Sequence, residues 1–231
     1  MQRTFVISDL HGNDKVFFQW LRDVEFNTTT DDLIIAGDIL DRGDGGFKIL
    51  DWIINHEDYC TLIMGNHEEM FIDLIDNVKL YLATLDNSNY LQKNGMVVTL
   101  ERWLETVQAD RDKYRFAIKN ASLFVVLNKG QNKFFISHAG LKQHPKYNNL
   151  QDTISNTDWV DLLWSRTGKL YTEPNLVQIY GHTPTKTGEV IEEADNCFNI
   201  DGGCIFRDSL NYITIFTDGK FSIKQFKLDI V

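Results

Sequence analysis

The sequence predicts an α/β fold, and three observations support this prediction. Short apolar runs alternate with helical patterns over residues 1–85, which is typical of βαβ units with a parallel sheet. Six apolar runs are followed at once by a polar segment that contains glycine. The second half of the chain is rich in further strand patterns. We therefore expect β-sheets flanked by helices.

The N-terminal part of the chain carries the βαβ pattern. Strands are expected at residues 4–8, 32–36 and 60–64, which are short apolar runs. Between and after these runs, apolar residues recur at spacings of three and four, which places them on one face of a helix. The three sets are Val16, Phe17, Trp20, Leu21 and Val24, then Phe47, Leu50, Ile53 and Ile54, then Met70, Leu74, Ile75 and Val78.

Residues 90–120 are expected to be helical, and the pattern then changes to β. One apolar stripe in the helical part is interpreted as core packing: Met96, Val97, Leu100, Trp103, Leu104 and Val107. The segment NKGQN separates two strand patterns and predicts a hairpin. Strands are expected at residues 122–127, 133–137, 176–180, 197–200, 212–216 and 221–226. The acidic run at 192–195 is interpreted as a solvated loop.

Length and composition predict one globular domain. The 231 residues show no repeat and no Pro-rich linker, so we expect a single domain over 1–231 with a helical insert near 78–120. The net charge of -10 argues against binding to nucleic acid or to an anionic membrane. No run is long enough to span a bilayer or to serve as a signal peptide. Without a CxxC spacing, Cys60, Cys197 and Cys204 are expected to be buried thiols in a reducing cytoplasm.

Histidine, aspartate and asparagine gather in the loops that follow the predicted strands. In α/β sheets, ligands bind at the carboxyl ends of strands. Nitrogen and oxygen ligands without thiolates suit manganese, with iron or zinc as alternatives. The number of carboxylates and imidazoles exceeds the needs of one ion, so we expect two divalent ions that share a carboxylate. The residues in these loops are Asp9, His11, Asp38, Asp41, Asn66, His67, His138 and His182.

Five motifs carry a resemblance to a known family. The segments SDLHG, GDILDRG, GNHE, SHAG and YGHTP occur in this order. In this order they resemble the phosphoprotein phosphatase (PPP) family of metallophosphoesterases, and most of all its small bacterial and bacteriophage serine/threonine phosphatases. The resemblance covers residues 4 to about 204, whereas 78–120 and 141–160 carry no motif of the family. It implies a β-sandwich of mixed sheets flanked by helices, in the layer order α/β/β/α.

The resemblance also implies a metal centre. It assigns six residues to two metal ions: Asp9 and His11 to the first, Asn66, His138 and His182 to the second, and Asp38 as the bridge. Ser8 and Ala139 stand where the family usually has glycine, and both changes should leave the ligands in place. Asp201 follows a strand and is expected either to orient a ligand or to form a turn. The regulatory loop of eukaryotic relatives is replaced by NIDGGC, so no regulatory subunit is expected.

Four further residues are implied to act on the phosphate group. Arg42 and Arg166 would bind its oxygens, together with Asn66. His67 would protonate the leaving group as a general acid, and Asp41 would orient His67 and raise its pKa. A hydroxide shared by the two metals would then attack phosphorus directly, without a covalent intermediate.

Three functions are compatible with these residues. The resemblance favours a metal-dependent phosphomonoester hydrolase that acts on phosphoserine, phosphothreonine and also phosphotyrosine in proteins, because Asp41, Arg42 and Glu68 are intact. The alternative is a hydrolase of dinucleoside polyphosphates such as diadenosine tetraphosphate. A metal-binding scaffold without catalysis is disfavoured, because no residue that the chemistry needs is missing. Four aromatic residues could either stack on a nucleotide base or pack in the core. They are Trp103, Tyr114, Trp159 and Trp164.

Overall fold

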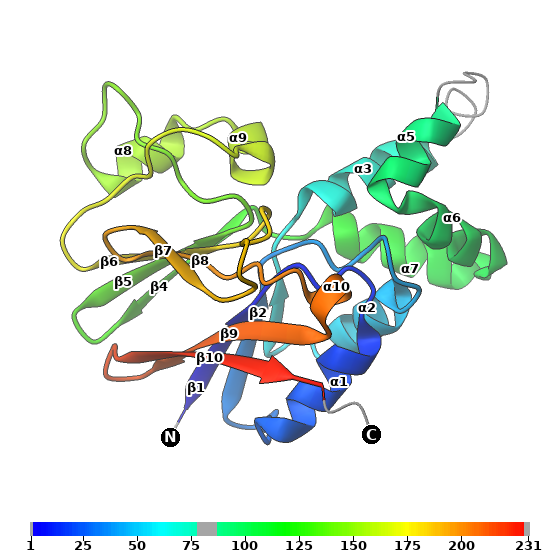
Figure 1. The fold of residues 1–231 in the computed structure, drawn as a ribbon, viewed down its shortest axis with the longest axis horizontal. Helices are drawn as coiled ribbons and strands as arrows, with labels where there is room; N and C mark the ends of the chain where they lie inside the picture. Colours follow the sequence, from blue (N-terminus) through cyan, green and yellow to red (C-terminus); the bar gives the residue numbers. More distant parts are fainter. Residues whose placement is uncertain (1, 78–86, 229–231) are drawn as a thin grey trace.

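Two five-stranded sheets lie at the centre of the protein, with helices on their outer faces (Figure 1). The structure is a computed structural model that describes residues 2–77 and 87–228. Part of the expected helical insert, 78–86, lies outside the described residues. The mixed sheets between helical layers confirm the predicted α/β/β/α sandwich.

The first sheet has the strand order β10-β9-β1-β2-β3. Its strands are β1 (Arg3–Ile7), β2 (Asp31–Ile35), β3 (Cys60–Leu62), β9 (Ser209–Phe216) and β10 (Phe221–Lys227). Strands β1, β2 and β3 are parallel, with Phe5 opposite Leu33, and β9 and β10 are antiparallel. The crossovers contain α1 (Asp14–Asp23) and α2 (Gly46–Ile54). The predicted βαβ units and parallel strands are therefore confirmed.

The second sheet has the order β4-β5-β6-β8-β7. Its strands are β4 (Phe124–Lys129), β5 (Asn132–Ser137), β6 (Leu176–Tyr180), β7 (Ile191–Ala194) and β8 (Cys197–Asn199). The predicted hairpin is confirmed as the antiparallel pair β4–β5. Strand β7 corrects the loop expected at 192–195. It pairs with β8 at the edge of the sheet, and its acidic side chains remain exposed to water, which protects an edge strand from pairing with another chain.

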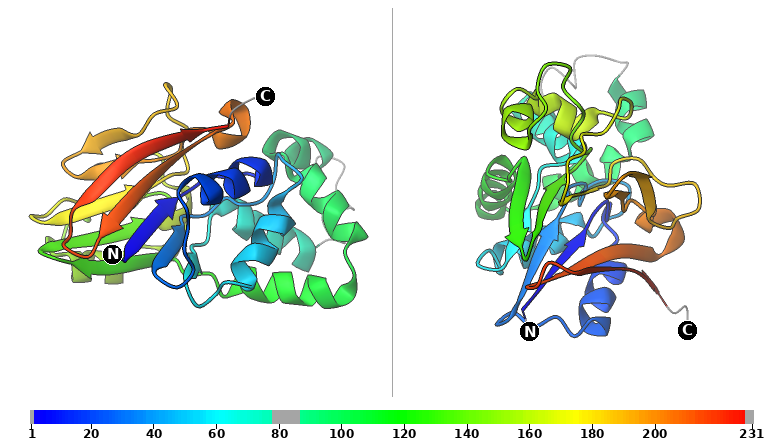
Figure 2. Two further views of the ribbon diagram at one scale, coloured as in Figure 1. Left: turned by 90° about the horizontal axis from the view of Figure 1, so that it is seen from below. Right: turned by 90° about the vertical axis from the view of Figure 1, so that its left-hand side faces the viewer.

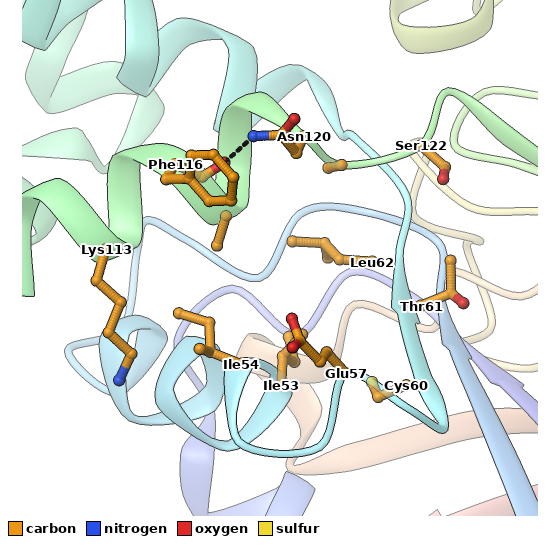
Figure 3. Close-up of a pocket in the computed structure, with 12 residues that line it drawn as sticks. Ile53, Ile54, Glu57, Cys60, Thr61, Leu62, Lys113, Phe116, Asn120 and Ser122 are labelled. Carbon is orange, nitrogen blue, oxygen red and sulfur yellow. Dashed lines mark hydrogen bonds between the residues drawn. The ribbon is translucent and has the colours of Figure 1, made fainter.

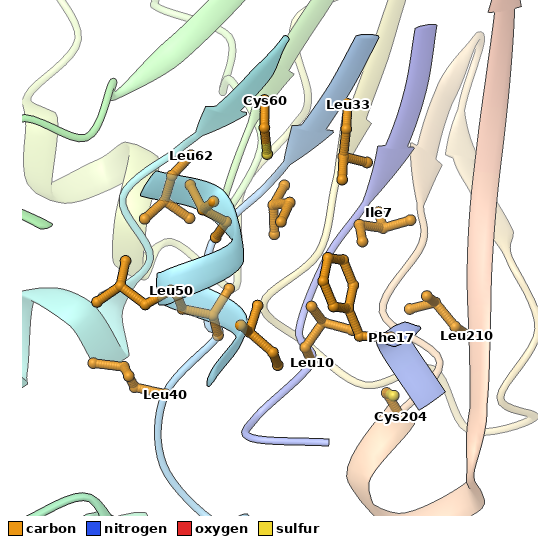
Figure 4. Close-up of a cluster of buried hydrophobic side chains, with 14 of the residues drawn as sticks. Ile7, Leu10, Phe17, Leu33, Leu40, Leu50, Cys60, Leu62, Cys204 and Leu210 are labelled. Atoms are coloured by element: carbon orange, nitrogen blue, oxygen red, sulfur yellow. The ribbon is translucent and has the colours of Figure 1, made fainter. Parts of the chain in front are cut away.

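Alternating side chains on the strands build separate layers of core. In β1, Val6 faces the second sheet and packs with Ile34 and Ile136, whereas Phe5 and Ile7 face the helices. Figure 4 shows the helical side, where Phe17 of α1 and Leu50 of α2 pack beneath the first sheet. A period of two along each strand places successive residues on opposite faces. Burial of the apolar residues on both faces therefore fixes the position of the first sheet between the helices and the second sheet.

Seven further helices complete the described chain. They are α3 (Asn66–Asp76), α5 (Asn87–Asn94), α6 (Met96–Glu105), α7 (Gln108–Lys119), α8 (Leu150–Ser155), α9 (Trp159–Trp164) and α10 (Cys204–Arg207). Helices α8 and α9 cover the outer face of the second sheet through Leu150, Leu162 and Leu163. Helices α5 and α6 lie farther from the two sheets (Figure 2), whereas α7 packs into the core on the helical side of the first sheet through Tyr114 and Ile118. The helical pattern at 90–120 is thus confirmed, whereas α8, α9 and α10 were not expected.

The apolar stripe on α6 is only partly in the core. Met96 is buried, and the ring of Trp103 packs edge-on against Phe71 at 5.3 Å. Leu104 and Val107 are 63% and 64% exposed. The expectation that the whole stripe is core is therefore wrong, because only the side of α6 that faces α3 and α2 is covered.

A pocket of about 350 Å³ lies away from the strand ends that carry the polar loops. Figure 3 shows it between the end of α2, the beginning of β3 and α7, with Ile53, Cys60 and Phe116 among its lining residues. All three cysteines are buried and unpaired, as expected. No helix in the described part of the chain is long and apolar enough to cross a membrane.

Candidate active site

The polar loops that follow parallel strands converge at one edge of the two sheets. Strands β1, β2 and β3 run parallel in one sheet, and β5, β6 and β8 run parallel in the other. Backbone hydrogen bonds tie the loops together, such as His11 N–H to the carbonyl of Asp38 at 2.9 Å and Gly181 N–H to the carbonyl of His138 at 2.8 Å. Residues far apart in the sequence are therefore held by main-chain contacts.

Four predicted metal ligands meet in one half of the site. Asn66 Oδ1 lies 3.0 Å from His138 Nε2 and 2.8 Å from His182 Nδ1, and these two nitrogens are 3.1 Å apart. Asp38 Oδ1 lies 3.4 Å from His138 Nε2. All four side chains are buried. One cation could be shared by these atoms, as the sequence predicts for the second metal.

The other half of the site contains the second oxygen of Asp38. His11 Nε2 lies 3.6 Å from Asp38 Oδ2, and His67 Nε2 lies 4.0 Å from the same oxygen. The possible ligand atoms of these three residues all lie within 4.8 Å of one another. Asp9, the other ligand predicted for the first ion, is not one of these three. Both of its oxygens accept the backbone N–H of His182 at 3.1 Å, and its carboxylate interacts electrostatically with that of Asp38. Asp38 thus stands between the two halves, one oxygen toward each.

The histidines are in the form that metal ions require. The Nδ1 of His11 lies 2.9 Å from the carbonyl of Leu40, and the Nδ1 of His138 lies 2.8 Å from the carbonyl of Ala36. These partners assign the ring proton to Nδ1 and leave a lone pair on Nε2. Burial also lowers the pKa of His11 to about 3 and the pKa of His138 below its usual range. Neutral imidazoles that face a carboxylate and an amide oxygen fit divalent cations.

The pKa values of the carboxylates in the site are shifted in opposite directions. Burial disfavours the charge of Asp38, but the nearby imidazoles of His138, His67 and His11 hold its pKa below the usual range. For Asp9, burial and the neighbouring carboxylates of Asp201 and Asp38 raise the pKa. Such crowding of acidic groups is costly without positive charge. Bound cations would offset this cost, which is a second reason that the residues fit a metal centre.

Arg42 contributes positive charge at the same place. Its guanidinium contacts His11 Nε2 and lies 3.2 Å from His67 Nε2. The side chain therefore lies against the two ring nitrogens that border Asp38. A guanidinium in this position can also donate to oxygens of a bound phosphate group, as the sequence predicts.

His67 is paired with Asp41. The Nδ1 of His67 lies 2.6 Å from Asp41 Oδ2, and both side chains are buried. Burial lowers the pKa of His67, but the carboxylates of Asp38 and Asp41 raise it more, so the pKa lies above its usual value. The protonated ring can act as a general acid. The geometry agrees with the pairing expected from the sequence.

Glu68 holds the loop that carries Asp38, a role that the sequence analysis did not assign. Its Oε2 accepts the backbone N–H of Asp38 at 2.7 Å and of Gly65 at 3.1 Å. Its Oε1 accepts the N–H of Ile39 at 2.9 Å and of Leu40 at 3.1 Å. The carboxylate is fully buried and fixes both loops next to the centre. Only the position of Glu68 beside Asn66 and His67 could have suggested this role.

Backbone strain is concentrated among the predicted site residues. Six of them have positive φ: Asp9, His11, Asp38, Asp41, Arg42 and His182. A non-glycine residue in this region costs about 1–3 kcal/mol. Strain of this kind persists only where the surroundings determine the backbone. Its concentration here indicates that contacts between the loops fix the backbone of the site.

Arg166 and Asp201 lie at the border of the site. Arg166 is exposed, and its guanidinium donates to Thr183 Oγ1 at 3.3 Å. Burial and the neighbouring charge of His138, followed by that of Arg166, lower the pKa of His182 to about 3. Asp201 is buried and accepts the N–H of Gly203 at 2.9 Å. It therefore takes part in a turn, and its carboxylate raises the pKa of the neighbouring Asp9. The role in orienting a ligand stays a prediction.

Comparison with known proteins agrees with this geometry. The sequence model of the calcineurin-like phosphoesterase family matches residues 2–230. The asymmetrical bis(5'-nucleosyl)-tetraphosphatase PrpE of Anoxybacillus flavithermus is 27% identical over 229 residues, which cover 89% of this chain and 87% of that protein. A symmetrical bis(5'-nucleosyl)-tetraphosphatase of Nitrosomonas europaea is 28% identical over 138 residues, which cover 60% of this chain but only 44% of that protein.

A solved structure supports the fold. A protein serine/threonine phosphatase from Saccharomyces cerevisiae superposes with a TM-score of 0.64 at 15% identity, covering 99% of this chain and 80% of that chain. The family match extends over nearly all of the chain and agrees with the resemblance found in the five motifs. We conclude that the chain belongs to the calcineurin-like phosphoesterase family and is a metallophosphoesterase.

Proposed function

We propose that the protein hydrolyses dinucleoside polyphosphates, with diadenosine tetraphosphate as the representative substrate. The observation that carries this proposal is the similarity to an asymmetrical bis(5'-nucleosyl)-tetraphosphatase, which extends over 89% of this chain and 87% of that relative. The predicted protein phosphatase activity becomes the second candidate. The supporting similarity to a protein phosphatase is one of fold, at 15% identity.

The proposed metal ligands are those inferred from the sequence. Asp9 and His11 would hold one divalent ion, Asn66, His138 and His182 the other, and Asp38 both, with manganese as our first choice. When bound, the ions would supply Lewis acidity toward the phosphoryl oxygens and lower the pKa of water. The donor set of oxygens and neutral imidazole nitrogens supports this assignment.

The remaining residues would act on the substrate directly. Arg42 and Arg166 would donate to non-bridging oxygens of the phosphoryl group, with interactions that strengthen as negative charge develops. His67 would give the proton on its Nε2 to the leaving oxygen as the phosphorus–oxygen bond breaks and water adds to phosphorus. Asp41, 2.6 Å from Nδ1, would keep the ring oriented and protonated.

Hydrolysis of phosphoserine or phosphothreonine in proteins is favoured by one observation. A serine alkoxide is a poor leaving group and needs a proton, whereas a nucleotide phosphate leaves readily. The buried pair of His67 and Asp41 is suited to protonating a poor leaving group. This geometry therefore keeps the phosphomonoesterase as the second candidate.

A direct comparison of substrates tests the proposal. The manganese-loaded protein would be given diadenosine tetraphosphate and a phosphoserine peptide, and kcat/KM measured for each. We expect the higher value for the dinucleotide, with ATP and AMP as products of asymmetrical cleavage. Two molecules of ADP would indicate symmetrical cleavage instead. A higher value for the peptide would favour the second candidate, and no turnover of either would contradict both.

A further inference from the structure

We propose that Thr99, in the helical insert, is a positioning residue for the general acid of this site. The hydroxyl of Thr99 holds the carboxylate of Asp41, which in turn holds the ring of His67. This inference rests on the proposed role of His67 as general acid. Thr99 lies in α6, within the segment 78–120 that carries no recognised family motif.

A continuous set of short contacts joins Thr99 to His67. Thr99 Oγ1 donates to Asp41 Oδ1 at 2.6 Å and accepts the backbone N–H of Asp41 at 3.0 Å. The other oxygen of Asp41, Oδ2, lies 2.6 Å from His67 Nδ1. All three side chains are buried, Thr99 at 4% and Asp41 at 0% exposure. Each oxygen of Asp41 thus has one defined partner, and Thr99 is the partner that is not part of the predicted site.

The position of Thr99 in its helix supports a purpose beyond packing. A threonine inside a helix often returns its hydroxyl to the carbonyl four residues earlier, which here belongs to Gly95. In this structure the carbonyl of Gly95 instead accepts the N–H of Arg42 at 2.9 Å. The first turn of α6 therefore contacts both Asp41, through Thr99, and Arg42, through Gly95.

Asp41 and Arg42 need such outside contacts. They are consecutive residues with φ of 69° and 68°, a conformation that two non-glycine residues rarely adopt. Gly95 has φ of 73°, and a Cβ at this residue would lie 2.6 Å from Cγ of Arg42. The close approach of α6 therefore requires glycine at 95. The helical insert stabilises the strained loop that carries two of the proposed functional residues.

The test compares the rates with a good and a poor leaving group, because a positioning role and a purely structural role affect these two rates differently. Thr99→Val keeps the shape of the side chain but removes its hydroxyl, which leaves Asp41 Oδ1 and the N–H of Asp41 without that partner. The substrates are phenyl phosphate, a poor leaving group, and p-nitrophenyl phosphate, a good one. We expect kcat for phenyl phosphate to fall about tenfold more than kcat for p-nitrophenyl phosphate, because only the poor leaving group depends on the acid.

Two variants of Thr99 and one matched control complete the design. Thr99→Ser keeps the hydroxyl and should restore the wild-type ratio of the two rates. Thr99→Ala should repeat the loss, and it replaces the valine variant if that protein fails to fold. Thr153→Val is the control, since Thr153 is also buried in a helix and donates to the carbonyl of Asn149 at 2.8 Å, in α8. It should leave both rates unchanged.

A double-mutant cycle with His67→Asn gives the decisive comparison. If Thr99 acts through His67, Thr99→Val should cause no further leaving-group discrimination once the imidazole is gone. Equal losses for both substrates in Thr99→Val, or the same discrimination with and without His67, would overturn the inference. If His67→Asn leaves the rates with both substrates at their wild-type values, His67 is not the general acid. That result differs from a failure of the Thr99 inference, so the two can be distinguished.

Discussion

The ring of His67 and the carboxylate of Asp41 lie 2.6 Å apart, although the two residues are separated by 26 positions in the chain. This contact directs the free nitrogen of His67 toward Asp38 and Arg42, at 4.0 Å and 3.2 Å. The proton that the ring could donate therefore faces the centre of the site. The pair converts an ordinary helix-starting residue into a candidate acid.

Replacing His67 should expose its role through the leaving group. In His67→Asn we expect hydrolysis of phenyl phosphate to slow by about 10²-fold or more, since general acids contribute about 10²–10⁴-fold. The rate with p-nitrophenyl phosphate should fall much less. Steady-state kinetics with both esters measure the difference. His56→Asn is the control, because that ring stacks on Trp52 outside the site. Equal loss with both substrates would remove His67 from the acid role.

Removing the shared carboxylate should weaken metal binding. Asp38→Asn takes away one charge between the two groups of ligands, so we expect fewer than two bound manganese ions per chain and a loss of activity of more than about 100-fold. Metal content by mass spectrometry after dialysis, together with kcat, tests this. Chelation of the wild-type protein should also abolish activity until manganese is returned. The exposed Asp58 provides the control, since Asp58→Asn should retain both ions. Two ions bound to Asp38→Asn would contradict the proposed bridge.

An exposed aromatic ring beside Arg42 should contribute to nucleotide binding. Phe206 in α10 is 70% exposed, and the guanidinium carbon of Arg42 lies 6.0 Å from the centre of its ring. Stacking of a base on such a ring is worth about 1–3 kcal/mol. In Phe206→Ala we therefore expect KM for diadenosine tetraphosphate to rise about 5- to 150-fold, while KM for a phosphoserine peptide changes little. Phe116→Ala, also 71% exposed but beside the distant pocket, is the control. An unchanged KM for the dinucleotide would exclude stacking on this ring.

Stability at acid pH should depend on the buried carboxylate of Asp31. Burial raises the pKa of Asp31, but hydrogen bonds from Arg3 and from the N–H of Asn27 lower it more, so its pKa in the folded protein lies below the usual value. A depressed pKa stabilises the fold above the unfolded pKa of about 3.9, and this contribution is lost as the pH falls through the folded pKa. We expect Asp31→Asn to lower the free energy of unfolding by about 1–2 kcal/mol at pH 7, and by less near pH 3, which lies below the unfolded pKa.

Urea unfolding of both proteins at the two pH values measures this difference. The neighbouring Asp32→Asn is the control, since the carboxylate of Asp32 accepts a hydrogen bond at 3.2 Å from the exposed amide of Gln2. A difference between wild type and Asp31→Asn that stays constant down to pH 3 would show that the charge of Asp31 is not the source of the stability.

Much of the fold could be predicted because its signals are local. A short apolar run defines β1, and helical spacing of apolar residues defines α1, so both appear in the sequence at nearly their final bounds. The edge strand β7 could not be predicted, because Glu192 and Glu193 are exposed and only pairing with β8 makes the segment a strand. The exposure of Leu104 could not be predicted either, because an apolar stripe on a helix does not show which of its residues another helix will cover.

The side chains that could form the site were predictable from the chain alone, because the residues that follow each strand share one edge of a sheet whenever the strands run parallel. Asp38 and His138 could therefore be named before any coordinates. Their surroundings were visible only in the folded protein: the carboxylate of Glu68 accepts four backbone N–H groups, and the hydroxyl of Thr99 donates to Asp41. Such contacts join segments that are far apart in the sequence, and their distance in space depends on how the helices pack on the sheets. Contacts of this kind leave no periodic pattern in the sequence from which they could be predicted.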